Sequence, residues 1–178
     1  VISAMVTHLK DSEHEIDYAA LEKLVEHLLA TGTSAIVVAG TTGESPTLED
    51  SEKKDLLKAT IKLVNGRAKV IMGTGSNITA KSIKATKEAE ALGADGALVV
   101  APYYNKPSQA GLLAHFGAVA EASDLPIIMY NIPGRTGINM AVETILELAD
   151  KYKNIVAVKD STGNVDQASD IAAKAPET

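Results

Sequence analysis

Lys159 is the residue of this sequence whose type and place point most directly to chemistry. It follows the apolar run at residues 155–158, and with strict alternation along a strand it shares a face with Ile155 and Ala157. If that face is the inside of a barrel, partial loss of water favours the neutral amine, which is nucleophilic toward a carbonyl carbon. The alternative is a lysine that reaches from a strand end into solvent.

Tyr130 ends the preceding apolar run, at residues 126–130. The backbones of neighbouring strands lie about 4.8 Å apart, so a phenol on the strand before Lys159 can lie beside its amine. Such a phenol can carry protons between the amine, the carbinolamine and the substrate. An amphipathic ring that caps the core is the alternative.

A pair of threonines lies in the turn Gly40-Thr41-Thr42-Gly43-Glu44. This turn lacks the Gly-Lys-Ser/Thr ending of a phosphate loop, which argues against nucleotide binding. Its glycines allow a tight turn, in which the threonine hydroxyls and backbone N–H groups can hold a carboxylate. Because a hydroxyl both donates and accepts, a threonine here can also connect two tyrosines. An ordinary turn that leads into a helix is the alternative.

Two further loops carry candidate residues. Arg135 lies in the Pro- and Gly-containing loop at residues 131–137, where its guanidinium can bind a second carboxylate bidentately, unless it is simply an exposed loop arginine. Tyr104 lies in the aromatic turn at residues 103–107, which suits either a binding site or an oligomer contact.

All of these residues follow short apolar runs that predict strands. The runs are continuous and rich in Val and Ile, as in a parallel sheet that is covered on both faces, and helical patterns alternate with them. Thr47-Leu48-Glu49-Asp50 has the form of a capping box at the start of the second helix. The predicted strands are residues 2–6, 35–39, 69–72, 96–101, 126–130 and 155–159, and the predicted helices are residues 18–30, 48–64, 79–92, 111–121, 141–152 and 165–175.

The repeat of strand and helix predicts an α/β fold. The sequence has no Gly-x-Gly-x-x-Gly fingerprint of a dinucleotide-binding sheet, and polar residues follow each strand, which favours a TIM (β/α)8-barrel type. Only about six βα units are present, whereas a barrel needs eight and roughly 250 residues. We therefore expect residues 1–178 to form a single, incomplete TIM-barrel domain.

Composition excludes several classes of protein. The net charge of −6 argues against nucleic acid or an anionic membrane as a partner, and the absence of cysteine excludes disulfides, thiol catalysis and cysteine–metal sites. No apolar run reaches the ~20 residues of a membrane helix, so we expect a cytoplasmic protein. His8, His14, His27 and His115 lack metal-ligand spacing, and we expect no metal site.

Four motifs occur along the whole chain: Gly40-Thr41-Thr42-Gly43-Glu44-Ser45-Pro46-Thr47-Leu48, Pro102-Tyr103-Tyr104-Asn105-Lys106-Pro107, Tyr130-Asn131-Ile132-Pro133-Gly134-Arg135-Thr136-Gly137 and Val158-Lys159-Asp160. In this order they closely resemble the dihydrodipicolinate synthase family, which is part of the pyruvate-dependent Schiff-base aldolase superfamily. The resemblance implies a TIM-barrel lyase of lysine biosynthesis. Such an enzyme condenses pyruvate with L-aspartate 4-semialdehyde to give 4-hydroxy-tetrahydrodipicolinate.

The resemblance also implies a role for each catalytic residue. Lys159 would form the imine with pyruvate, and Tyr130 would relay protons. Thr42 would connect Tyr130 to Tyr104, and Tyr104 would reach in from a neighbouring subunit. A homo-oligomer, a dimer or a tetramer, is therefore expected.

The substrate-binding roles follow from the same resemblance. Thr41 and Thr42 would receive the carboxylate of pyruvate, and Arg135 would hold the carboxylate of the semialdehyde. No metal or organic cofactor is expected. When a proton leaves the methyl group of pyruvate, the imine nitrogen itself accepts the electrons of the broken C–H bond.

Three alternatives remain open at the level of sequence. The first alternative is a sialic-acid lyase or a sugar-acid aldolase, because these enzymes share the lysine, the tyrosine and the Gly-x-Thr-Gly-Glu turn. A catalytically dead, truncated barrel fragment is the second alternative, because the family's seventh and eighth βα units are missing. A sensor that binds a 2-oxo acid without forming an imine is the third. The first loop also departs from the family, with Thr7-His8-Leu9 where Thr-Pro-Phe is usual.

Overall fold

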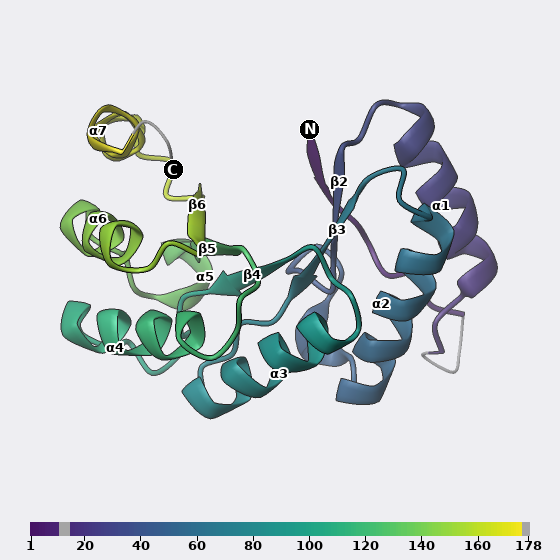
Figure 1. Cartoon of the computed structure of the whole chain (residues 1–178), viewed down its shortest axis with the longest axis horizontal. Coiled ribbons are helices and arrows are strands. Elements are labelled where there is room, and N and C mark those ends of the chain that lie inside the picture. The colour runs from purple at the N-terminus through teal and green to yellow at the C-terminus, as the bar shows by residue number, and fades with distance from the viewer. Residues whose placement is uncertain (11–14, 176–178) are drawn as a thin grey trace. The chain divides into compact units, whose positions relative to one another are not determined.

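The computed structural model describes residues 1–10 and 15–175, so His14 lies outside the described residues. The chain divides into two compact units. The N-terminal unit comprises the described residues of Val1–Gly73 and Ala89–Gly96, and the C-terminal unit comprises those of Thr74–Glu88 and Ala97–Thr178. Each unit is an α/β structure of parallel strands and covering helices (Figure 1).

The N-terminal unit is a parallel sheet of three strands packed against two helices. The pairs Ile2↔Ala35 and Ala35↔Lys69 set the register of its strands. The middle strand is buried along its whole length, which is why it has no polar residue. The elements are β1 (Ile2–Ala4), α1 (Tyr18–Ala30), β2 (Ala35–Val38), the 3-10 helix η1 (Ser45–Thr47), α2 (Asp50–Val64) and β3 (Lys69–Gly73).

The starts of α1 and α2 are fixed by side-chain caps. Asp17 caps α1, because its Oδ1 accepts hydrogen bonds from the N–H groups of Ala19 and Ala20, both at 3.0 Å. The capping box of α2 is formed by Glu49 and Glu52, and the Glu49 N–H donates to Glu52 Oε2 at 2.7 Å. The capping box predicted at Thr47 is therefore wrong by two residues, because Thr47 belongs to η1 instead.

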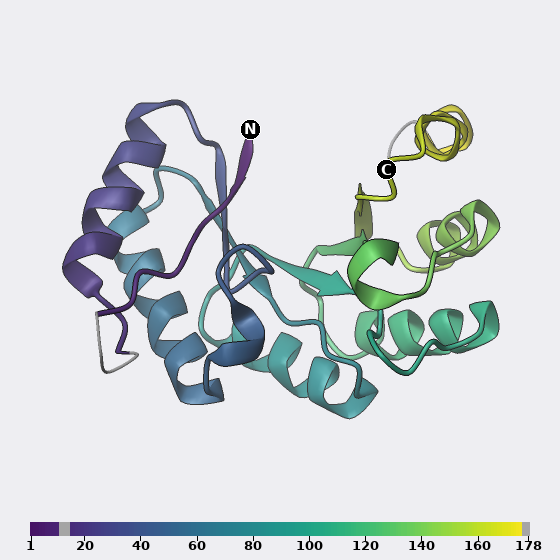
Figure 2. The same ribbon diagram turned by 180° about the vertical axis from the view of Figure 1, so that it is seen from behind.

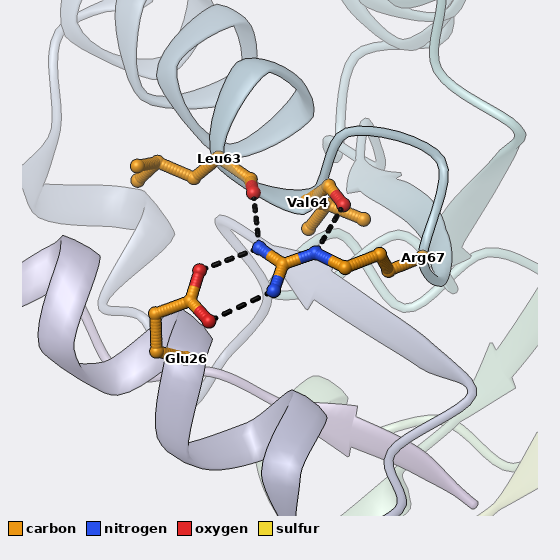
Figure 3. A network of polar contacts seen from close by, with 4 residues as sticks. All are labelled: Glu26, Leu63, Val64 and Arg67. Carbon is orange, nitrogen blue, oxygen red and sulfur yellow. Dashed lines mark hydrogen bonds and ion pairs between the residues drawn. The ribbon is translucent and has the colours of Figure 1, made fainter.

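An ion pair joins α1 to the turn that follows α2 (Figure 3). The Arg67 guanidinium donates from both terminal nitrogens to the Glu26 carboxylate, with Nη1 to Oε2 at 2.8 Å. It also donates to the carbonyls of Leu63 and Val64 at the end of α2. The hydrogen bond from Arg67 holds the pKa of Glu26 below its usual value. This arrangement satisfies carbonyls that a helix end otherwise leaves unpaired.

The C-terminal unit follows the same plan. In its sheet β4 pairs with β5 and β5 with β6, all in parallel, and α4, α6 and α7 lie in a row, each packed on the next (Figure 1, Figure 2). Its core includes Phe116, Met129 and Ile145, each with no exposed surface. The elements are most of α3 (Thr79–Ala91), β4 (Gly96–Val100), α4 (Gln109–Ala120), β5 (Ile127–Asn131), α5 (Pro133–Thr136), α6 (Val142–Lys151), β6 (Ile155–Asp160) and α7 (Val165–Lys174).

The alternation of strand and helix predicted from the sequence is confirmed throughout the described residues, with ends that differ by a few residues. Besides η1, one further segment differs in type. The loop predicted after Tyr130 contains the short helix α5, which has Pro133 in its first turn and ends at Gly137 with a φ of 74°. Proline at a helix start and glycine at its end are the local signals that explain this helix.

Candidate active site

Lys159 and Tyr130 lie side by side at the end of the sheet in the C-terminal unit. They are register partners on β6 and β5, and the Lys159 Nζ lies 4.1 Å from the centre of the Tyr130 ring. Tyr130 is buried, with 4% of its surface exposed, and Lys159 is half-buried. An ammonium over the face of a phenol ring is attracted by the ring quadrupole. The two residues singled out for imine chemistry are therefore in contact.

The residues that share a strand face with Lys159 differ from the sequence prediction in one respect. Ile127 pairs with Ile155, but Ile128 pairs with Ala157, so β6 carries one extra residue in a β-bulge. Partners in a parallel pair point to the same face, and successive residues alternate. Ala157 therefore shares the face of Lys159 as predicted, whereas Ile155 lies on the opposite face. The prediction for Ile155 is wrong because the bulge interrupts the alternation.

The opposite face of the same strand ends carries a polar network around the buried side chain of Asn131. Asn131 has no exposed surface, and its Nδ2 donates to Asp160 Oδ1 at 3.0 Å and to Asn139 Oδ1 at 2.8 Å. Its Oδ1 accepts from the Met140 N–H at 3.1 Å. The other carboxylate oxygen of Asp160 accepts from Thr162 Oγ1 at 2.6 Å. Neither Asn131 nor Asp160 is among the predicted site residues, although each directly follows one.

The threonine pair lies in the N-terminal unit, in the turn between β2 and η1. Thr41 is half-buried and Thr42 is exposed. The turn is held by the side chain of Thr7, whose Oγ1 donates to the carbonyl of Gly43 at 2.8 Å. A Cβ at Gly43 would lie 3.0 Å from the Met5 carbonyl oxygen and 3.1 Å from Thr7 Oγ1, so glycine allows this close approach.

Tyr104 and Arg135 are both exposed residues of the C-terminal unit. Tyr104 has 89% of its surface exposed and a left-handed φ of 70°. A non-glycine residue in this region is uncommon, and the turn is held in place by the Asn105 Nδ2, which donates to the Asn77 carbonyl at 2.9 Å. Arg135 lies on α5, which follows directly after the β5 strand that carries Tyr130.

His115 is a buried histidine of α4. Its Nδ1 and Thr79 Oγ1 are 2.9 Å apart, 4% of its surface is exposed, and its Nε2 has no hydrogen-bond partner among the described residues. Burial lowers the pKa of His115 to about 4, so the ring is neutral at neutral pH. Across residues 1–10 and 15–175, no three His, Asp or Glu side chains gather in a way that could hold a metal ion.

Two further observations concern other described residues. A shallow hollow of about 290 Å³ in the N-terminal unit is lined by Glu26, Leu29, Ala30, Thr33 and Arg67, none of which the sequence analysis selected. Among the helices that the structure describes, none is both long enough and apolar enough to cross a membrane.

Comparisons with known proteins agree along the whole chain. Residues 1–178 match the profile of the dihydrodipicolinate synthetase family. The 4-hydroxy-tetrahydrodipicolinate synthase of Listeria welshimeri is 56% identical over 99% of this chain, and that of Microcystis aeruginosa is 53% identical over 99%. The chain spans about 60% of the length of these curated relatives.

Solved structures give the same result for the fold. The dihydrodipicolinate synthase of Aquifex aeolicus is 50% identical, with a TM-score of 0.94 over 97% of this chain and 58% of its own. The 4-hydroxy-tetrahydrodipicolinate synthase of Methylacidiphilum fumariolicum is 46% identical, with a TM-score of 0.95 over 98% of this chain and 58% of its own. These neighbours have TIM-barrel folds, so the predicted fold class is confirmed for the part of the barrel that this chain covers.

Proposed function

The chain belongs to the dihydrodipicolinate synthetase family, and on this premise we propose that the protein is a pyruvate-dependent lyase of lysine biosynthesis. Its substrates are pyruvate and L-aspartate 4-semialdehyde, and its product is 4-hydroxy-tetrahydrodipicolinate. The observation that carries the proposal is the contact at the end of the sheet, where the Lys159 Nζ lies 4.1 Å from the centre of the Tyr130 ring. An amine beside a buried phenol is the pair of groups that imine formation needs.

The reaction begins at Lys159. Its neutral amine attacks the ketone carbon of pyruvate to give a carbinolamine, and loss of water gives the imine. Each of these steps moves a proton, and Tyr130 is the neighbouring group that gives and takes it. The protonated imine nitrogen then accepts electrons as a proton leaves the methyl group. The resulting enamine attacks the aldehyde carbon of the second substrate and forms the new carbon–carbon bond.

Binding of the two carboxylates is assigned to residues outside this contact. We assign the carboxylate of pyruvate to Thr41 and Thr42, whose turn combines hydroxyls with backbone N–H groups, and the carboxylate of the semialdehyde to the exposed Arg135. These assignments rest on the sequence motifs. Arg135→Lys removes the bidentate fork but keeps the charge, so it should raise the KM for the semialdehyde and leave imine formation with pyruvate unchanged.

Reductive trapping tests the imine. With pyruvate and borohydride, the mass of the protein should rise by one pyruvic acid less one oxygen atom, and peptide mapping should place the increase on Lys159. Lys159→Arg should give no adduct. Lys153→Arg is the matched control, because Lys153 is an exposed lysine near the start of the same strand. An adduct that persists in Lys159→Arg would show that another lysine forms the imine.

Turnover separates this function from its alternatives. The proposed enzyme consumes aspartate semialdehyde once the pyruvate imine has formed. A related sugar-acid aldolase or sialic-acid lyase would give the same trapped adduct but would turn over a sugar-derived substrate instead. A protein that binds pyruvate without any adduct would be a sensor. Trapping without turnover of any aldehyde would identify a catalytically inactive chain.

We also propose that the enzyme is a homo-oligomer in which Tyr104 serves the site of a neighbouring subunit. An exposed phenol fixed in a left-handed turn suits a contact that another copy completes. Mixing two inactive variants tests this directly. If Tyr104 acts across subunits, Tyr104→Phe chains mixed with Lys159→Arg chains should recover part of the turnover. If Tyr104 acts within its own chain, the mixture should stay inactive.

A further inference from the structure

The position of Lys159 depends on the extra residue in β6. The ladder starts with Ile127 opposite Ile155, and regular pairing from there would place Val158 opposite Tyr130. The bulge moves every later pair by one residue, so that Lys159 lies opposite Tyr130 instead. Because a one-residue shift turns each side chain to the other face, the unshifted strand would point its lysine away from the phenol.

Hydrogen bonds at the far end of the ladder fit only the shifted register. The Ser161 N–H donates to the Asn131 carbonyl at 2.8 Å, and the Asn131 side chain donates to Asp160 Oδ1 at 3.0 Å. The side-chain bond joins the register partners that directly follow Tyr130 and Lys159. It lies on the opposite face of the sheet, so it does not occupy space beside the amine.

The Asn131 side chain supplies both the donors and the acceptor that this position uses, and neither aspartate nor alanine supplies them. Its amide donates two hydrogen bonds, to Asp160 and Asn139, and accepts one from the Met140 N–H. An aspartate at this position could not donate, and an alanine would leave the buried Met140 N–H without this acceptor and remove the donor to Asp160 and Asn139. Asn131 therefore connects β6 to the segment that leads into α6.

We propose that the hydrogen bond between Asn131 and Asp160 is a register clamp that positions Lys159 over Tyr130. Asn131 and Asp160 are positioning residues, because they act through the strand pairing and not on the substrate. This inference rests on the proposed function, in which Lys159 forms the imine. It assigns a role to the two residues that directly follow the reactive pair in the sequence.

Variants of Asp160 separate the hydrogen bond from the charge. Asp160→Asn keeps an acceptor for Asn131, so the rate of reductive trapping with pyruvate should stay within about threefold of the parent rate. Asp160→Ala and Asn131→Ala remove the clamp, and trapping at Lys159 should slow by about 10- to 100-fold, because small displacements of a reacting group cost that much.

Asn154→Ala is the matched control. Its side chain donates to the carbonyls of Ala120 and Ser123, so the variant also removes two hydrogen bonds from the C-terminal unit, but at the amino end of β6, whereas Lys159 lies at the carboxyl end. It should lose thermal stability while its trapping rate stays at the parent value. If folded Asp160→Ala and Asn131→Ala behave like this control, the clamp is refuted. Should Asn131→Ala fail to fold, the comparison of Asp160→Ala with Asp160→Asn decides.

A second readout keeps the clamp separate from the imine. Competitive labelling with acetic anhydride reports how accessible each amine is, without any substrate. Labelling of Lys159 relative to Lys153 should rise several-fold in Asp160→Ala and stay at the parent ratio in Asp160→Asn. If the parent protein forms no pyruvate adduct, the proposed function fails, and this ratio still decides the clamp. An unchanged ratio in Asp160→Ala overturns it.

Discussion

Acid should destabilise this protein through one buried histidine. His115 packs edge-to-face against Phe116, and among residues 1–10 and 15–175 its side chain has one hydrogen-bond partner, with Nδ1 and Thr79 Oγ1 2.9 Å apart. Burial lowers the pKa of His115 from 6.5 to about 4. A proton on the ring would place a charge where no acceptor faces Nε2. His115 therefore binds a proton less tightly in the folded protein than in the unfolded chain.

The magnitude follows from the two pKa values. Each pKa unit corresponds to about 1.4 kcal/mol, so a folded pKa of about 4 against 6.5 in the unfolded chain amounts to about 3 kcal/mol at most. This contribution is fully present above pH 6.5 and is lost as the pH falls toward 4, because only the unfolded chain is protonated in that range. At pH 5 about 2 kcal/mol of the free energy of unfolding should be gone.

Urea unfolding at pH 7 and at pH 5, followed by circular dichroism, measures this loss. His115→Gln removes the titrating ring, so between the two pH values it should lose about 2 kcal/mol less than the parent protein. His27→Gln removes an exposed histidine of the N-terminal unit and should behave like the parent. Equal losses in the parent and in His115→Gln, or an NMR titration of His115 near its usual pKa, would refute the reasoning.

Three shorter predictions concern other residues. Tyr130→Phe should still form the pyruvate adduct, but turnover should fall by about 100-fold or more, because the proton relay is lost; normal turnover would remove Tyr130 from the mechanism. Gly75→Ala should lower stability by about 1–3 kcal/mol, since its Cβ would lie 2.3 Å from the Val100 backbone nitrogen, while Gly134→Ala, which meets nothing within 4 Å, should change stability little in the same thermal melts. Asn164→Ala should cost about 1 kcal/mol and Asn164→Gly only a few tenths, because Asn164 caps α7; equal costs would argue against the cap.

Much of the fold could be predicted because its signals are local. Continuous runs of Val and Ile define buried parallel strands, and amphipathic periods with flanking glycines define the helices between them. The closeness of Lys159 and Tyr130 was also predictable, because the carboxyl ends of neighbouring parallel strands meet at one edge. The predicted capping box differs from the observed one only in the capping residue, because the start of α2 uses Glu49 instead of Thr47.

Other parts of the site depend on pairs of segments that the sequence does not relate to each other. The bulge in β6 exists only relative to β5, so alternation along β6 alone assigned Ile155 to the wrong face. Asn131 looked like an ordinary loop residue, because its partners Asp160 and Asn139 come from a neighbouring strand and from the segment before α6. Its role was visible only once the strands were paired.

By itself, then, the sequence determined which segments become strands and helices and which polar residues follow the strands, since periodicity and turn chemistry are properties of one stretch of chain. The tertiary structure alone decided the register that sets Lys159 over Tyr130 and the burial that keeps His115 neutral. Both depend on which atoms of distant segments come into contact. Pairing and desolvation arise only when the chain has folded, and a pattern of residue types does not contain them.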